Sequence, residues 1–195
     1  FGFWILSDEI YARLAYDNIN VPSIASLPGM IDKTIIMDGF SKTYAMTGWR
    51  LGYGIMPKSL AHVVQLLLTH SVGCTANFVQ IAGIEALTGP QEQVKKVVHE
   101  YQQRRDAIVT GLNSIDGITC KCPQGAFYVF PNIKSFSIAS SEFADLLLEK
   151  AGVAVLPGSA FGEYGEGYLR LTYSDSIENI NRAIDKIAKA VKDLI

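Results

Sequence analysis

Short apolar runs alternate with helical patterns over the first ninety residues. The apolar runs are 3–7, 34–37 and 51–56. Each has the length of a buried strand. Apolar residues at helical spacing predict one helix that begins at Pro57 and a second over 77–87, which Gly89-Pro90 ends. Strands that alternate with helices favour an α/β fold with a mostly parallel sheet.

The pattern changes after residue 90. An apolar stripe predicts a long helix from Pro90 to Asp116-Gly117 that connects two domains. Asp175, three residues before Glu178, is the predicted N-cap of a last helix, and Ser140 or Ser141 caps an earlier one. The remaining predicted elements are strands over 118–122, 126–130, 153–156 and 168–173 and a helix over 143–151. We therefore expect three parts, namely 1–89 in a large α/β domain, 90–116 as a connecting helix and 117–195 as a smaller α+β domain.

Composition narrows the classes of function. Hydrophobic residues make up 49% of the 195 residues and charged residues 18%, which is enough to bury a sizeable core. A formal net charge of -2 gives no basic surface for nucleic acid, and no run reaches the ~18 apolar residues of a membrane span. The three cysteines and three histidines show no metal-site spacing, so we expect structural roles in a cytoplasmic protein. The chain begins without Met inside a predicted strand, which suggests a piece of something longer.

A cluster of polar and glycine residues follows the second predicted strand. Residues 38–54 read DGFSKTYAMTGWRLGYG and carry Lys42 and Arg50 between two apolar runs. Ligand sites of α/β proteins lie at such strand ends. The alternative interpretation is a surface turn with two solvated cations. For a lysine considered by itself, this alternative would be favoured.

Three further residues have two interpretations each. Strand alternation puts Arg170 on one face with Tyr168 and Thr172, so that its charge pairs either with an internal carboxylate or with the anion of a ligand. Asp8 and Tyr11 follow the first strand and either enter one cleft or form an ordinary turn. Other arginines, Arg13, Arg104 and Arg105, are interpreted as solvated charges.

The combination resembles the class I aminotransferases, which are pyridoxal-phosphate (PLP) enzymes of the aspartate aminotransferase fold, fold type I. The motifs are Asp8-Glu-Ile-Tyr11, Ser41-Lys42-Thr-Tyr44 with Met46-Thr-Gly-Trp-Arg50-Leu-Gly52, Gly125-Ala-Phe-Tyr-Val-Phe130 and Tyr168-Leu-Arg170-Leu. The resemblance covers the whole chain but only the C-terminal half of a typical family member. The family's N-terminal half, with an asparagine that contacts the cofactor ring oxygen, has no counterpart here.

The resemblance implies roles for three residues around the cofactor ring. Lys42 resembles the lysine that forms the Schiff base with PLP and, once released, moves the α-proton of the substrate. Asp8 resembles the carboxylate that keeps the pyridine nitrogen protonated, so that the ring withdraws electrons. Tyr11 resembles the donor to the ring's phenolic oxygen.

The resemblance also implies anion-binding roles. Ser41 and Arg50 resemble the ligands of the cofactor phosphate, and Arg170 resembles the clamp on the substrate α-carboxylate. The family further implies a homodimer whose partner subunit lends residues to the site. No second substrate-facing arginine can be assigned, so the side chain of the substrate is left open.

Three functions follow from these residues. The first is ping-pong transfer of an amino group between an α-amino acid and a 2-oxo acid. The second is another PLP reaction on the same framework, such as a β-lyase. The third is a catalytically incomplete fragment or sensing module. We expect residues 1–195 by themselves to bind PLP poorly and to be inactive, because much of the cofactor pocket belongs to the family's N-terminal half.

Overall fold

The computed structural model describes residues 2–194, and the chain divides into two compact units, residues 1–98 and 99–195. The division falls within the long helix α3 (Glu92–Asn113), which begins two residues after the expected Pro90. The predicted domain boundaries after residues 89 and 116 stay predictions. Each unit is described by itself.

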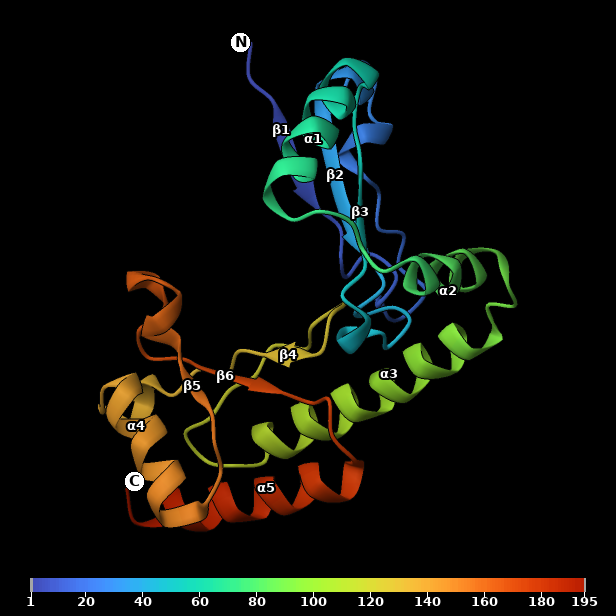
Figure 1. Ribbon diagram of the computed structural model, residues 1–195. Helices are drawn as coiled ribbons and strands as arrows, with labels where there is room; N and C mark the ends of the chain where they lie inside the picture. The colour runs from blue at the N-terminus through green and yellow to red at the C-terminus, as the bar shows by residue number, and fades with distance from the viewer. Residues whose placement is uncertain (1, 195) are drawn as a thin grey trace. The chain divides into compact units, whose positions relative to one another are not determined.

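Unit 1 is built on a three-stranded sheet with the order β1-β2-β3 (Figure 1). Its strands are β1 (Ile5–Asp8), β2 (Thr34–Gly39) and β3 (Gly52–Ile55). β1 and β2 are parallel, whereas β2 and β3 are antiparallel. The α/β class is therefore correct, but these three strands are mixed rather than mostly parallel. Residues 40–51 join β2 to β3 as the connection of an antiparallel pair, whereas the longer segment 9–33 forms the crossover that the parallel strands β1 and β2 need.

Two helices follow the sheet in unit 1, α1 (Lys58–Ser71) and α2 (Asn77–Thr88). Pro57 is the N-cap of α1, at the predicted start of that helix. The predicted apolar face of α1 is not buried, since Val63 and Leu67 are 59% and 65% exposed. The small core of the unit comprises Leu14, Tyr16, Thr34, Phe40, Thr43 and Val79. Short 3-10 turns lie at Ile24–Ser26, Ile31–Lys33 and Thr47–Trp49.

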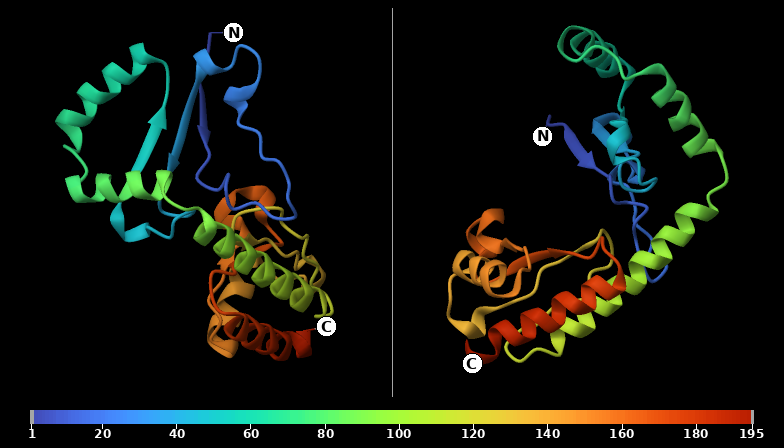
Figure 2. Two further views of the ribbon diagram at one scale, coloured as in Figure 1. Left: turned by 90° about the vertical axis from the view of Figure 1, so that its right-hand side faces the viewer. Right: turned by 60° about the horizontal axis from the view of Figure 1, so that its bottom comes forward.

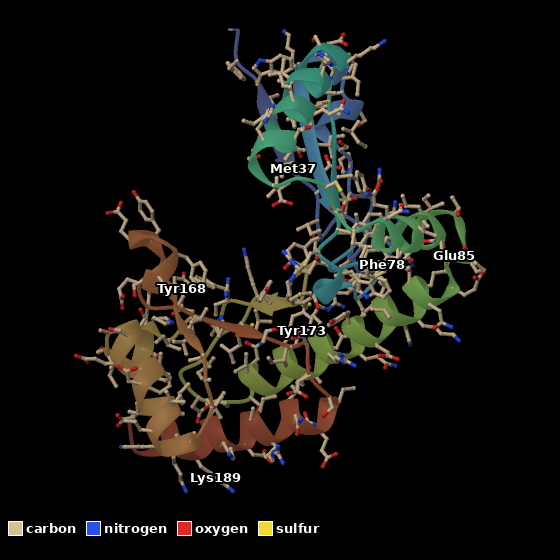
Figure 3. The ribbon with its side chains drawn as sticks, in the orientation of Figure 1. Met37, Phe78, Glu85, Tyr168, Tyr173 and Lys189 are labelled. Atoms are coloured by element: carbon tan, nitrogen blue, oxygen red, sulfur yellow. The ribbon has the colours of Figure 1, made fainter. Side chains whose placement is uncertain are left out.

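Unit 2 contains a smaller antiparallel sheet with the order β4-β6-β5 (Figures 1 and 2). Its strands are β4 (Tyr128–Val129), β5 (Leu156–Pro157) and β6 (Leu169–Thr172). Tyr168 and Tyr173 stand at the two ends of β6, the middle strand (Figure 3). This antiparallel sheet with flanking helices agrees with the α+β character expected for the C-terminal part.

Among the described residues, several predicted strands of unit 2 are shortened or absent, and the one expected over 126–130 is reduced to the two residues of β4. The segment 118–122 forms no strand, because the backbone of Cys120 bonds to a side chain instead: Asn113 accepts from its N–H at 2.8 Å and donates to its carbonyl at 3.0 Å. Only Thr119 forms an isolated bridge, to Asn132. The strand expected over 153–156 is reduced to β5, which begins at Leu156.

The helices of unit 2 are α4 (Ser140–Leu146), which continues as a π-helical turn over Leu147–Ala151, and α5 (Ile177–Val191). The N-cap of α5 is Ser176, whose hydroxyl accepts from the N–H of Asn179, so the prediction of Asp175 was one residue early. Neither Ser140 nor Ser141 is the N-cap of α4, because that position is Ala139. Remaining 3-10 turns are Lys134–Phe136, Gly158–Phe161, Glu163–Gly165 and Lys192–Leu194.

The core of unit 2 lies between α3, α5 and the sheet. α5 buries Ile180, Ile184, Ile187 and Val191, and α3 buries Ile108 and Leu112. Both stripes follow the helical spacing that the sequence shows. None of the helices within residues 2–194 is both long and apolar enough to cross a membrane.

Candidate functional site

The loop that joins β2 to β3 carries most of the predicted site and is fixed at its base. We call residues 40–51 the Lys42 loop. The N–H of Phe40 donates to the carbonyl of Leu51 at 3.2 Å, and the carbonyl of Phe40 accepts from Tyr44 and Met46, each at 3.3 Å. These bonds give Lys42, which is half-buried, a defined backbone position.

The backbone of the Lys42 loop is strained at two points. Ala45 and Arg50 have φ angles of 54° and 53°, in the left-handed region that costs a non-glycine residue about 1 kcal/mol or more. Close packing holds the loop from outside. A Cβ added to Gly83 of α2 would lie 2.4 Å from Leu51 and 3.2 Å from Phe40. Strain that the surroundings maintain in this way is common at ligand sites.

Asp38 and Tyr53 lie opposite each other in the β2–β3 pair, just outside the loop. The Tyr53 hydroxyl donates to Oδ2 of Asp38 at 2.8 Å, and the N–H of Gly39 donates to Oδ1 at 2.6 Å. Burial, together with the bond and the charge of Asp38, raises the pKa of Tyr53 to about 12. The sequence analysis missed this pair. The signal was available, because the two residues flank the loop at matching hairpin positions.

Asp8 and Tyr11 lie at the same edge of the sheet as the Lys42 loop. Parallel pairing puts Asp8 beside Met37, so both strands end where the loop begins. Asp8 is exposed, and its Oδ1 accepts from the N–H of Ile10 at 3.1 Å. Nζ of Lys42 lies 6.0 Å from the centre of the Tyr11 ring. The structure thus places the amine of Lys42 near the ring of Tyr11, two residues to which the resemblance gives separate roles at the cofactor.

The two predicted phosphate ligands belong to the same loop. Ser41 is half-buried next to Lys42, while Arg50 is exposed and donates from Nη1 to the carbonyl of Thr47 at 2.8 Å. Their hydroxyl and guanidinium groups are suitable donors for a phosphate. With the Lys42 amine and the Asp8 carboxylate, this donor set fits the aldehyde, pyridine nitrogen and phosphate of PLP.

Arg170 belongs to unit 2, where it is half-buried in β6. Its Cζ lies 4.8 Å from the centre of the Tyr128 ring and 4.3 Å from that of the Phe161 ring. Within residues 2–194, no carboxylate forms an ion pair with this guanidinium. The internal ion pair that the sequence left open is therefore absent from the described part of the chain.

Arg105 is not the solvated charge that we expected. It is 3% exposed, pairs with Asp106 at 2.8 Å and donates to the carbonyl of Pro123 at 3.2 Å. The sequence held a sign of this burial, because Arg105 precedes the buried residues Ile108 and Leu112 by three and seven positions. Residues at this spacing share one helix face. Arg105 therefore ties α3 to the segment that leads into β4.

The other two arginines have partners at the surface. Arg104 forms an exposed ion pair with Glu100 at 3.3 Å, four residues earlier on α3. Arg13 is exposed and donates to the hydroxyl of Tyr44 in the Lys42 loop.

The three cysteines lie in different surroundings, because Cys120 is buried whereas Cys74 and Cys122 are exposed. All three are free thiols, and burial raises the pKa of Cys120 to about 11, which disfavours the reactive thiolate. Among residues 2–194, no three His, Cys, Asp or Glu side chains come close enough together to hold a metal ion.

Comparison with known proteins adds a family match to this geometry. The model of the family described as aminotransferase class I and II matches residues 1–187. A putative aminotransferase of Bacillus subtilis is 44% identical over 95% of this chain and 47% of its own length. An aspartate aminotransferase of Pyrococcus horikoshii is 43% identical over 98% of this chain and 49% of its own length. The chain thus spans about half the length of these curated relatives.

A solved structure shows the same fold. The aromatic aminotransferase of Pyrococcus horikoshii superposes with a TM-score of 0.95 and 38% sequence identity, over 98% of this chain and 52% of that one.

Proposed function

Because the chain belongs to the class I and II aminotransferases, we propose that it forms the C-terminal half of an enzyme that transfers an amino group between an α-amino acid and a 2-oxo acid with PLP. The observation that carries the proposal is the position of Lys42 beside Tyr11, at the sheet edge where Asp8 ends β1. PLP, when bound, supplies an aldehyde for the amine and a ring that withdraws electrons from the substrate Cα.

Each site residue of unit 1 then has a distinct task. The amine of Lys42 holds the cofactor and, when free, takes up and returns the α-proton of the substrate. Asp8 keeps a proton on the pyridine nitrogen through its negative charge, and Tyr11 donates to the ring oxygen. Ser41 and Arg50 bind the phosphate. The hydrogen-bonded backbone of the Lys42 loop holds Ser41, Lys42 and Arg50 at fixed positions relative to one another.

Arg170 binds the α-carboxylate of the substrate. Its guanidinium presents parallel N–H donors that match a carboxylate, and a half-buried position strengthens that interaction relative to water. Since every amino acid carries this carboxylate, Arg170 selects the substrate class and not the side chain. Relatives named for aspartate and for aromatic amino acids both match the chain, which leaves the side chain open.

Another PLP reaction, such as a β-lyase, would use the same cofactor and carboxylate groups. An assay of amino-group transfer to a 2-oxo acid, run beside an assay of ammonia and pyruvate release, separates the two. A sensing module would bind PLP without either activity. The homodimer and the cytoplasmic location stay predictions.

The covalent role of Lys42 is tested by borohydride reduction of the complete protein loaded with PLP. We expect reduction to fix one cofactor on the peptide that contains Lys42, and Lys42→Ala to abolish both the fixation and the transfer. Lys33→Ala, at an exposed position in the same unit, is the matched control and should change neither. Unchanged fixation in Lys42→Ala, read by mass spectrometry, would refute the assignment.

A further inference from the structure

Two aromatic rings reach Arg170 from both sides of its strand. β6 is the middle strand of the small sheet, with β4 on one side and β5 on the other. Tyr128 comes from β4, and Phe161 ends the 3-10 turn that follows β5. Their ring centres lie 4.8 Å and 4.3 Å from Cζ of Arg170, well within the range of cation–π attraction.

The faces and the edge of a guanidinium group interact with different kinds of partner. The planar faces of the group are weakly hydrated and stack on aromatic rings, whereas the edge carries the N–H donors. Rings against the group therefore restrict its position without using a donor. Within the described residues, the guanidinium of Arg170 forms no hydrogen bond or ion pair, so its N–H donors are available to an outside anion.

Further contacts fix both rings. Phe161 packs edge-on against Phe130 at 6.1 Å, and Tyr128 packs on Phe127 at 4.8 Å. Phe127 is buried and stacks on Tyr101 of α3 at 5.4 Å. Phe161 itself is 48% exposed, so the loss of its ring removes little core packing.

We propose that Tyr128 and Phe161 are positioning residues for Arg170: they hold its guanidinium with the N–H edge free and thereby set the affinity for the α-carboxylate of the substrate. The proposal rests on the proposed function, in which Arg170 binds that carboxylate. Through Arg170, the two rings then contribute to a preference of the protein for amino acids over amines that lack an α-carboxylate. The rings contact Arg170, and we expect their effect on the substrate to pass through its guanidinium.

The experiment compares matched substrates in the complete, PLP-loaded protein. The substrates are the best L-amino acid donor and the amine that corresponds to it without the α-carboxylate. For Phe161→Leu and Tyr128→Leu, we expect KM for the amino acid to rise about three- to tenfold with little change in kcat, as the loss of one cation–π contact implies. Kinetics with the amine should stay unchanged. Tyr128→Phe keeps a ring and should rescue the affinity.

Two controls separate a positioning role from a structural one. Tyr164→Leu removes a 91% exposed ring from the neighbouring turn and should have no effect. Calorimetric titration with the unreactive α-methyl derivative of the amino acid measures binding without turnover and should show the same loss as KM. Equal losses with both substrates, or losses that track a lower melting temperature, would overturn the proposal.

The Arg170→Gln variant separates a failure of the positioning role of the rings from a failure of the proposed function. If Arg170→Gln removes the preference for the carboxylate and the ring variants then add nothing, the positioning role is supported. If Arg170→Gln removes the preference but the ring variants leave KM unchanged in the unaltered background, the positioning role is wrong and the proposed function stands. If Arg170→Gln leaves the preference intact, the carboxylate role of Arg170 fails and the positioning role fails with it.

Discussion

Tyr53 and Asp38 close the base of the Lys42 loop through one hydrogen bond between neighbouring strands. The bond requires the proton of Tyr53. Burial first, and then the bond and charge of Asp38, raise the pKa of Tyr53 from 10.0 to about 12. Below pH 10 the hydroxyl is protonated in both the folded and the unfolded state, so its contribution to stability is complete. Between pH 10 and 12 only the unfolded state loses the proton, and that contribution fades.

We therefore expect Tyr53→Phe to destabilise the protein by about 1 kcal/mol at pH 8, the usual net value of one hydrogen bond. The difference from the unaltered protein should shrink as the pH rises from 10 through 12, because the unfolded state of the unaltered protein loses the Tyr53 proton in this range while the folded state retains it. Urea unfolding followed by circular dichroism at several pH values measures it. Tyr164→Phe, at an exposed tyrosine, is the control. A difference that stays constant with pH would contradict the linkage.

Single charged residues show where sequence reasoning succeeds and where it stops. The motif around Lys42 identified the family, which the match over residues 1–187 confirms. Helical spacing placed Arg105 on the buried face of α3, but the carbonyl that accepts its hydrogen bond there belongs to Pro123, eighteen residues away. The rings near Arg170 were missed for the same reason, since strand pairing brings Tyr128 and Phe161 to it. Local patterns carry no information on such contacts.

The packing of α3 against α5 depends on one small residue. A Cβ added to Gly111 of α3 would lie 2.2 Å from Cδ1 of Ile184 on α5, and 3.0 Å from its two γ carbons. Glycine within a helix costs about 1 kcal/mol relative to alanine. The close approach of the two helices offsets this cost, because it brings the apolar stripe of α5 against α3.

We expect Gly111→Ala to destabilise the protein by about 1 kcal/mol, since a clash of about 2 kcal/mol exceeds the gain in helix propensity. Ile184→Val removes the nearest carbon and should relieve part of the clash. The double variant should thus be more stable than the sum of the single effects by about 1 kcal/mol. Denaturant unfolding of the four proteins measures the coupling. Thr110→Ala, on the exposed side of α3, is the control and should leave the stability unchanged. If the effects of Gly111→Ala and Ile184→Val were strictly additive, the close packing of the two residues would be contradicted.

The strongly periodic helices and the strands of four or more residues were predictable, whereas the shorter strands of unit 2 were not. The stripes of α3 and α5 lie where the sequence placed them, because helix periodicity reflects one buried face. The segment 118–122 has strand-like residues, but Asn113 takes the backbone bonds of Cys120. A side chain that competes with a strand ladder in this way leaves no periodic signal.

At the scale of the whole chain, the helices of unit 1 have large apolar side chains that are exposed at the surface. α1 is the clearest case, with Val63, Leu66, Leu67 and Leu68 between 46% and 65% exposed. Val63, Leu66 and Leu67 are three and four residues apart and so share one face of the helix, and an apolar helix face of this kind is normally buried. Phe78 and Ile81 of α2 are 69% and 60% exposed. Exposed apolar surfaces of this kind favour association with another apolar surface.

We therefore expect residues 1–195, produced by themselves, to self-associate and to bind PLP weakly, although Lys42 is present. Light scattering after size-exclusion chromatography should give a mass above that of one chain, 21.3 kDa. Val63→Gln with Leu67→Gln should reduce this association, because both side chains leave one exposed face of α1. Thr69→Gln, at an exposed polar site on the same helix, should not. A stable monomer that binds PLP tightly through Lys42 would show that residues 1–195 already form a complete site.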